Sequence, residues 1–252
     1  MLILNHTVPD ALILPEPPRD LAPSLRDSSA HWFSADPAFV TWVAGLPQTV
    51  TDLRSRTSAA CAVQTAANRN HTVFAGQGGS EHLIFAKGQH CGFMWDGAGV
   101  DPQNWSCALR FHAADNDART LMTLNAKGTD NYVFLQQIKG QMILKDQQNT
   151  HELTRSAICS EGPMLVTLGM SQNRLWLRLS GETTHSSAAR IDLHGPLTFF
   201  IGCRSNKPRL LKTLGGFALF DVVIWPDSNI LDQCADGPLE ALEQGDLWRP
   251  AP

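Results

Sequence analysis

The sequence is poor in charge and has no long apolar run. Only 17% of its 252 residues are Asp, Glu, Lys or Arg, and the net charge is −4. Proteins that bind nucleic acid by neutralising phosphates need a basic surface, so this composition argues against a nucleic-acid partner. The apolar stretches fall well short of the roughly 20 residues that span a bilayer as a helix, so we expect no membrane insertion.

The signatures of common nucleophile and zinc sites are also missing. The six cysteines are scattered, with no C-x-x-C pair, and most lie beside apolar neighbours. This pattern predicts buried free thiols, with one disulfide still possible. The glycines before Ser80 do not complete a G-x-S-x-G nucleophile elbow.

The N-terminus shows no recognisable export signal. Its short apolar runs follow no basic residue, and Pro9 and Pro15 interrupt them. Residues 1–30 hold five of the fifteen prolines, which predicts an extended arm. We therefore predict an arm over 1–30, a domain over 31–236 and a tail over 237–252.

What the chain does contain is a succession of short strand-like segments. From residue 81 onward they recur roughly every 8 to 15 residues, separated by turn-forming sets such as KGTD and SGET. In "NRLWLRLSG" three leucines alternate with Trp176 and Arg178, which predicts a strand with one buried face. The pattern is typical of an all-β sandwich or barrel.

One late segment, "LGGFALFDVVIW", predicts the strand that closes the core. It is rich in aromatic and β-branched residues, Gly215 and Gly216 precede it, and Pro226 ends it. We expect a strand that is buried on both faces, or nearly so. Its single charge, Asp221, would then need hydrogen-bond partners to be tolerated.

The order of segments from about 81 to 232 resembles the laminin G-like, concanavalin A-like jelly-roll superfamily. The matching units, in order, are "RTLMTLNA", "DNYVFLQQIKGQMILKD", "PMLVTLGMSQNRLWLRLSGE", "LTFFIGCRSN" and "LGGFALFDVVIWPDSNILD". The resemblance implies a two-sheet antiparallel jelly-roll sandwich behind the proline-rich arm. It also implies a lectin-like function.

Catalysis is not favoured within that resemblance. The family's β-glucan-cleaving members carry two glutamates and an aspartate on one face of one strand, and this chain has no such stretch. Lyases on jelly rolls use a Tyr or His base, and the single tyrosine, Tyr132, lies in an apolar segment. A polysaccharide lyase or hydrolase therefore stays a third alternative.

Sugar binding calls for aromatic faces beside amides and charged groups. "MWDGAGVDPQNW" and "CRSNKPR" offer such groups. The candidate ligand-binding residues are Trp95, Asp96, Asn104, Trp105, Arg204, Asn206, Lys207 and Arg209. The alternatives are core packing for the tryptophans and a solvated turn for the basic loop.

Calcium is the one cofactor that the sequence suggests. "HAADNDART" and "GTDNY" place oxygen donors in successive loops, and Ca²⁺ takes several such ligands. The candidate ligands are Asp115, Asp117, Asp130 and Asn131. The alternative is that they are turn residues at strand ends.

The leading hypothesis is a non-catalytic carbohydrate-binding or adhesion module that recognises a cell-surface or extracellular glycan. The runner-up is a structural or interaction domain of a phage-like particle, such as a spike or fibre decoration, with possible homo-oligomer or particle assembly. Either hypothesis implies an extracellular or particle-surface location, and a cytoplasmic stage before release is compatible with the missing signal peptide.

Overall fold

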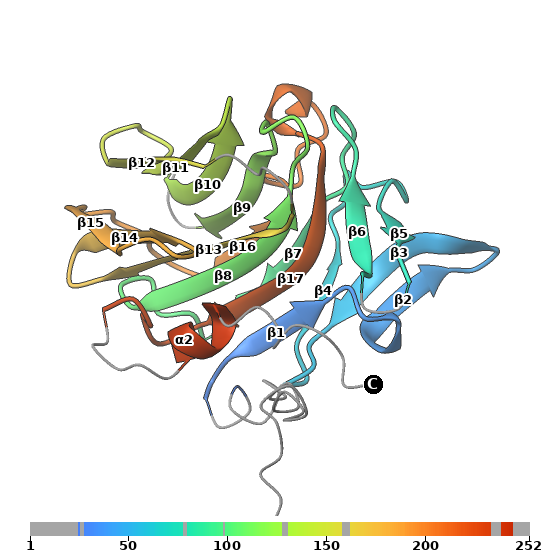
Figure 1. Cartoon of the computed structure of the whole chain (residues 1–252), viewed down its shortest axis with the longest axis horizontal. Coiled ribbons are helices and arrows are strands. Elements are labelled where there is room, and N and C mark those ends of the chain that lie inside the picture. Colours follow the sequence, from blue (N-terminus) through green and yellow to red (C-terminus); the bar gives the residue numbers. More distant parts are fainter. Residues whose placement is uncertain are drawn as a thin grey trace, which may run out of the picture.

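The computed structural model describes residues 25, 28–77, 80–97, 99–127, 131–157, 162–232 and 238–243. Most of the predicted arm and tail, and Asp130, Cys159 and Cys234, lie outside the described residues. The described part is all-β, with seventeen strands and little helix (Figure 1). Its helical pieces are two 3-10 turns, Pro37–Phe39 and Leu211–Thr213, and one short helix, α2 (Pro238–Glu243). None of them is long and apolar enough to cross a membrane.

Antiparallel pairing arranges the strands in two layers. We call the first the β17 layer, and it contains β15 (His185–Ala188), β14 (Arg174–Leu179), β13 (Met164–Ser171), β8 (Trp105–His112), β17 (Phe217–Trp225), β1 (His31–Ser34), β6 (His82–Phe85) and β5 (Val73–Ala75). The second is the β9 layer, and it contains β12 (Glu152–Ser156), β11 (Gln141–Asp146), β10 (Tyr132–Ile138), β9 (Arg119–Ala126), β16 (Leu197–Ile201), β7 (Phe93–Asp96), β4 (Cys61–Gln64), β3 (Leu46–Arg54) and β2 (Val40–Val43).

The two layers are continuous rather than separate. Strand β3 pairs with β4 in the β9 layer and, through Thr49 opposite Val73, with β5 in the β17 layer. All seventeen strands therefore belong to one sheet that folds over on itself. The predicted all-β, antiparallel architecture is confirmed, whereas the division into two separate jelly-roll sheets is not.

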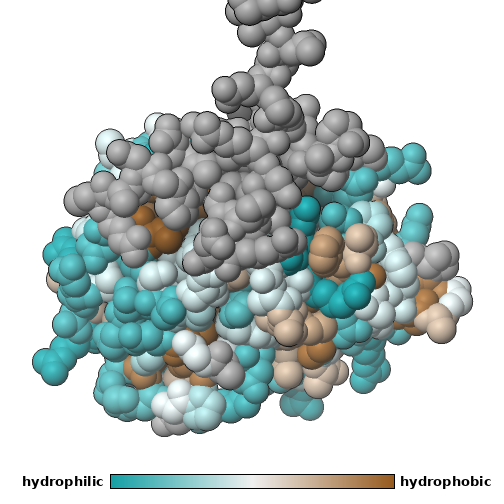
Figure 2. All heavy atoms as spheres, turned by 90° about the horizontal axis from the view of Figure 1, so that it is seen from below, coloured by the Kyte–Doolittle hydropathy of each residue, from teal (hydrophilic) through white to brown (hydrophobic). Residues whose placement is uncertain are grey.

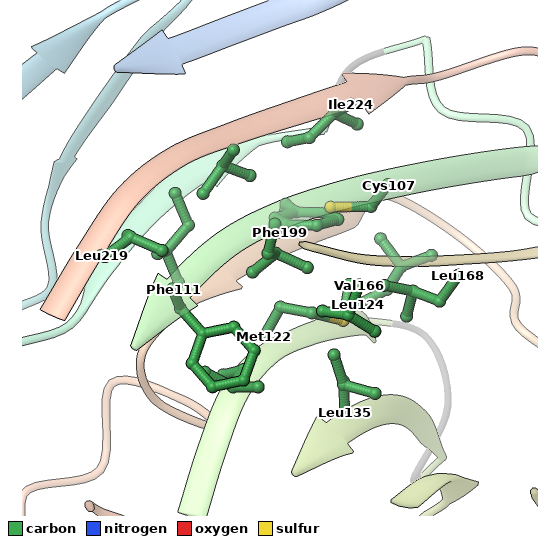
Figure 3. Close-up of a cluster of buried hydrophobic side chains, with 14 of the residues drawn as sticks. Cys107, Phe111, Met122, Leu124, Leu135, Val166, Leu168, Phe199, Leu219 and Ile224 are labelled. Atoms are coloured by element: carbon green, nitrogen blue, oxygen red, sulfur yellow. The ribbon is translucent and has the colours of Figure 1, made fainter. Parts of the chain in front are cut away.

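The main hydrophobic core lies between the layers (Figure 3). Side chains from β8 and β17, among them Phe111 and Ile224, point toward side chains from β9 and β16, among them Met122 and Phe199. All four are fully or almost fully buried. Burial of apolar surface from both layers is the main stabilising contribution in such an architecture.

Strand β17 closes this core, as its sequence predicts. One edge of it pairs with β8 along most of its length, and the other edge pairs with β6 over its first half and with β1 over its second half. Val222 and Ile224 belong to the core between the layers, while Val223 and Trp225 belong to a second cluster on the other side of the sheet. The strand is therefore buried on both faces over its second half.

The second cluster covers part of the outer face of the β17 layer. Leu25, Trp32 of β1 and Leu242 of α2 pack there against Val223 and Trp225. Helix α2 is held to the layer by an ion pair, in which Arg178 of β14 donates two hydrogen bonds, of 2.7 and 2.6 Å, to Glu243. This part of the outer face is consequently closed to a ligand.

Asp221 lies at a bulge of β17 and is 2% exposed. Its carboxylate accepts hydrogen bonds from Trp32 Nε1 at 2.9 Å and from Arg110 Nε at 3.0 Å. A terminal nitrogen of Arg110 lies 2.9 Å from the same carboxylate. Burial raises the pKa of Asp221, while the Arg110 charge and the Trp32 hydrogen bond oppose that rise. The partners that the sequence required for this charge are present.

We expect Arg110→Met to lower the free energy of unfolding by about 3 kcal/mol, because it leaves the buried Asp221 carboxylate without its ion-pair partner. The folded-state pKa of Asp221 then rises further above its unfolded value. Protonation stabilises the folded state more than the unfolded one, so the deficit is larger at pH 7 than at pH 5. Urea unfolding of the variant and the unaltered protein at both pH values measures this difference in stability.

The double variant Arg110→Met/Asp221→Leu is the control for this pair. It removes the unpaired charge and should recover part of the lost stability. A double variant less stable than Arg110→Met alone would contradict the assigned role of the ion pair.

Candidate functional site

The outer face of the β9 layer carries many polar side chains, whereas the outer face of the β17 layer carries the apolar second cluster. Strand β7 turns Phe93 and Trp95 inward and Met94 and Asp96 outward, as the two-residue period of a strand requires. The burial pattern agrees, because Phe93 and Trp95 are buried and Asp96 is exposed.

Strand register aligns outward side chains of four strands in one row. Thr198 of β16 lies opposite Asp96 of β7 on one side and Asn125 of β9 on the other, and Asn125 lies opposite Tyr132 of β10. The next row is more apolar, with Phe200 opposite both Met94 and Thr123. A polar row thus runs beside an apolar one across this face.

A hollow of about 300 Å³ opens over these rows. Its lining residues are Met94, Asp96, Asn125, Lys127, Thr198, Phe200, Ser205, Asn206 and Lys207. They supply a carboxylate, two ammonium groups, two amides and two hydroxyls around an apolar floor. Small-molecule sites commonly combine an apolar surface with a few converging polar groups in this way, and this volume is at the small end of their range.

The loop after β16 folds back to form one wall of the hollow, and Arg204 fixes it there. Arg204 Nε donates to Thr120 Oγ1 at 3.2 Å, and a terminal nitrogen donates to Gln136 Oε1 at 2.8 Å. Its guanidinium also stacks on Phe134, 4.0 Å from the ring centre. The side chain therefore joins the loop to β9 and β10.

His90 contacts the backbone of the same loop. It is 5% exposed, its Nδ1 lies 3.3 Å from Thr65 Oγ1, and it hydrogen-bonds the backbone of Ser205. Burial lowers the pKa of His90, and the hydrogen bond to Ser205 partly offsets this effect. A neutral imidazole is thus favoured behind the wall of the hollow.

Three of the eight predicted ligand-binding residues meet in the hollow: Asp96, Asn206 and Lys207. Arg204 lies behind them as the anchor of the loop rather than as a lining residue. Arg209 is exposed further along the same loop and does not line the hollow.

The prediction that two tryptophans form a sugar-binding surface is wrong. Trp105 is 0% exposed, and Trp95 is 6% exposed and packs in the core, with its ring centre 4.6 Å from that of His31. Neither can lay an aromatic face against a ligand. Asn104 is not part of the hollow either, since its side chain donates to the Asp227 carbonyl at 2.8 Å and accepts from the Asn229 amide at 3.1 Å.

The three described members of the predicted calcium set, Asp115, Asp117 and Asn131, do not lie together. Asp115 and Asp117 precede β9, whereas Asn131 follows it, and an eight-residue strand separates its two ends by roughly 25 Å. Both aspartates already contact Lys87 Nζ, at 3.4 and 3.3 Å. Asp130 lies outside the described residues, within which no group of three metal-ligating side chains occurs.

Sequence reasoning missed Asn125, Lys127 and Thr198. Asn125 and Thr198 sit at outward positions of strands that otherwise read as apolar, as in "RTLMTLNA" and "LTFF". The strand period would have placed them on the outer face, but only the pairing of β16 between β7 and β9 brings them beside Asp96.

A second, larger hollow of about 770 Å³ lies over β5 and β6. It is lined mainly by apolar side chains, including Val73, Phe74 and the 39%-exposed Ile84, and Glu81 is the one charged residue among its described lining. On the face seen in Figure 2, the described surface is mostly hydrophilic, and its hydrophobic residues form small separate groups. The hollow over β7, β16 and β9 offers far more hydrogen-bonding groups.

Comparisons with known proteins give likeness at the level of fold. No protein-family model matches the sequence, and no curated protein matches it. Among solved structures, domain 4 of an extracellular GH43 arabinanase from Geobacillus stearothermophilus, in complex with arabinotriose, is similar with a TM-score of 0.55 and 16% identity. The match covers 81% of this chain and 94% of that domain.

Two further similar structures are much longer than this chain. The botulinum neurotoxin serotype D/C binding domain matches with a TM-score of 0.57 and 10% identity, over 88% of this chain and 53% of that one. Trypanosoma rangeli sialidase in complex with sialic acid matches with 0.56 and 11%, over 84% of this chain and 32% of that one. Identities this low establish a shared all-β fold alone, and the laminin G-like resemblance is not confirmed.

We expect Arg204→Ala to loosen the wall of the hollow, because it uncovers Phe134 and removes the donor bound by Gln136. The free energy of unfolding should fall by about 1–2 kcal/mol, and backbone amides at 203–207 should exchange faster with deuterium. Hydrogen-exchange mass spectrometry and thermal unfolding measure the two effects. Arg209→Ala, in the same loop but exposed, is the matched control and should change neither.

Proposed function

We propose that this protein is a non-catalytic carbohydrate-binding module, and that the hollow over β7, β16 and β9 holds the sugar of a cell-surface or extracellular glycan. The observation that carries the proposal is the convergence of Asp96, Asn125 and Asn206 with hydroxyl and ammonium groups in one small hollow. Sugar hydroxyls both donate and accept, and such a mixed set satisfies both roles.

The apolar floor supports this proposal. Met94 and Phe200 lie in the row beside the polar one, and Met94 is the one that a ligand can contact, since it is partly exposed while Phe200 is 5% exposed. The C–H faces of a sugar ring need an apolar surface of this kind while the hydroxyls reach the rim. Two of the similar structures, the arabinanase domain and the sialidase, hold arabinotriose and sialic acid.

The charges of the hollow favour binding over hydrolysis. Glycosidases of the common kind need two carboxyl groups that flank the scissile bond. Asp96 is the one carboxylate among the described lining residues. A single exposed carboxylate suits acceptance of sugar hydroxyl hydrogens.

A glycan array followed by titration calorimetry tests the function. For the best glycan, we expect Asp96→Ala/Asn125→Ala to weaken binding by roughly tenfold or more, because each loses hydrogen bonds to sugar hydroxyls. Asp115→Ala, at the other end of β9, is the matched carboxylate control and should bind as the unaltered protein does.

Two outcomes would contradict the proposal. Absence of any glycan signal would contradict the proposed carbohydrate-binding function. Loss of binding in Asp115→Ala, together with retention in the double variant, would move the site to the loop before β9. The same titration repeated with a chelator shows whether binding needs a divalent cation.

A further inference from the structure

The hollow and its wall carry more positive than negative charge. Lys127 and Lys207 line the hollow beside a single carboxylate, Asp96. Within the described part of the chain, neither lysine side chain makes a hydrogen bond, an ion pair or a ring contact. Their charges are therefore available to a ligand.

Arg204 adds a third cation, and no carboxylate of the described residues pairs with it. Its contacts among the described residues are the Thr120 hydroxyl, the Gln136 amide, the Phe134 ring and the Tyr132 hydroxyl, none of which is a carboxylate. Burial lowers the pKa of Arg204, since the guanidinium has lost water without gaining an anion. Arg204 is partly buried, and partial burial of a cation without a counter-ion has a cost that a bound anion nearby would offset.

The positive charge at the hollow contrasts with the negative net charge of the whole chain. The chain carries a net charge of −4, so its overall field repels anions. An anion must then be attracted by short-range contacts at the hollow, not by the protein as a whole. Two lysines against one carboxylate provide such a contact region, and Arg204 adds positive charge behind it.

We propose that the hollow takes a sugar bearing an anionic group, a carboxylate or a sulfate, with that group against Lys127 and Lys207 and its hydroxyls toward Asp96 and Asn125. This inference rests on the proposed carbohydrate-binding function and names its ligand class. The volume of about 300 Å³ suits a short segment or a chain end and not a long stretch of polysaccharide.

The ligands for the test are matched pairs that differ only in charge. One pair is a polyuronate oligosaccharide and its carboxyl-reduced form; the other is a sulfated galactan oligosaccharide and its desulfated form. We expect the charged member of at least one pair to bind roughly tenfold more tightly, since each charge-assisted hydrogen bond contributes on the order of 1.5–3 kcal/mol. The pair that shows the difference identifies carboxylate or sulfate as the anion.

The protein variants are Lys127→Met and Lys207→Met, each compared with Lys139→Met. Lys139 is exposed in the turn after β10, at the far end of that strand from the hollow. We expect each hollow variant to lose most of the preference for the charged ligand, because its affinity for the charged member of a pair falls several-fold more than its affinity for the neutral member. The salt dependence of binding should weaken in both, while Lys139→Met leaves preference and salt dependence unchanged.

The outcomes separate this inference from the function on which it rests. Equal affinity for charged and neutral ligands, unaffected by either lysine substitution, would overturn the anionic-sugar inference and leave carbohydrate binding standing. No binding of any of the four oligosaccharides, together with an empty glycan array, would overturn both. A thermal midpoint unchanged in each variant shows that loss of preference does not come from unfolding.

Discussion

The fold depends on covering both faces of β17. Its inward side chains complete the core between the layers, and its outward side chains, Val223 and Trp225, need a second cover, which Trp32 and Leu242 provide. A charge in such a strand is tolerated only because Arg110 and Trp32 satisfy Asp221. With this side of the molecule closed, the outer face of the β9 layer is where polar side chains can remain open to a ligand.

Local sequence was enough to predict the strands that carry strong signals. The segment between Gly216 and Pro226 forms β17, and the alternation in "RLWLRL" gives the alternating burial of β14. The joining of the two layers was not predictable in the same way. It depends on β3 meeting β5 through Thr49 and Val73, a contact between residues far apart in sequence that no local period encodes.

The site shows the same division between local pattern and long-range pairing. Trp95 was misjudged although the sequence held the signal, since it alternates in phase with Phe93, and one face of a strand is either core or surface. The predicted calcium ligands are divided between two places for a related reason. Loops that are successive in sequence lie at opposite ends of the strand between them, so Asp117 and Asn131 are neighbours along the chain and distant in space.

Arg204 shows why a binding loop of this kind needs an anchor of its own. A loop that follows an edge of the hollow would lose conformational entropy each time a ligand ordered it. The stacking on Phe134 and the hydrogen bonds to Thr120 and Gln136 are made within the protein itself, so that entropy is lost on folding instead. The same anchor brings a cation to the wall without a carboxylate partner. The rigidity of the loop and the positive charge behind its wall therefore follow from one side chain.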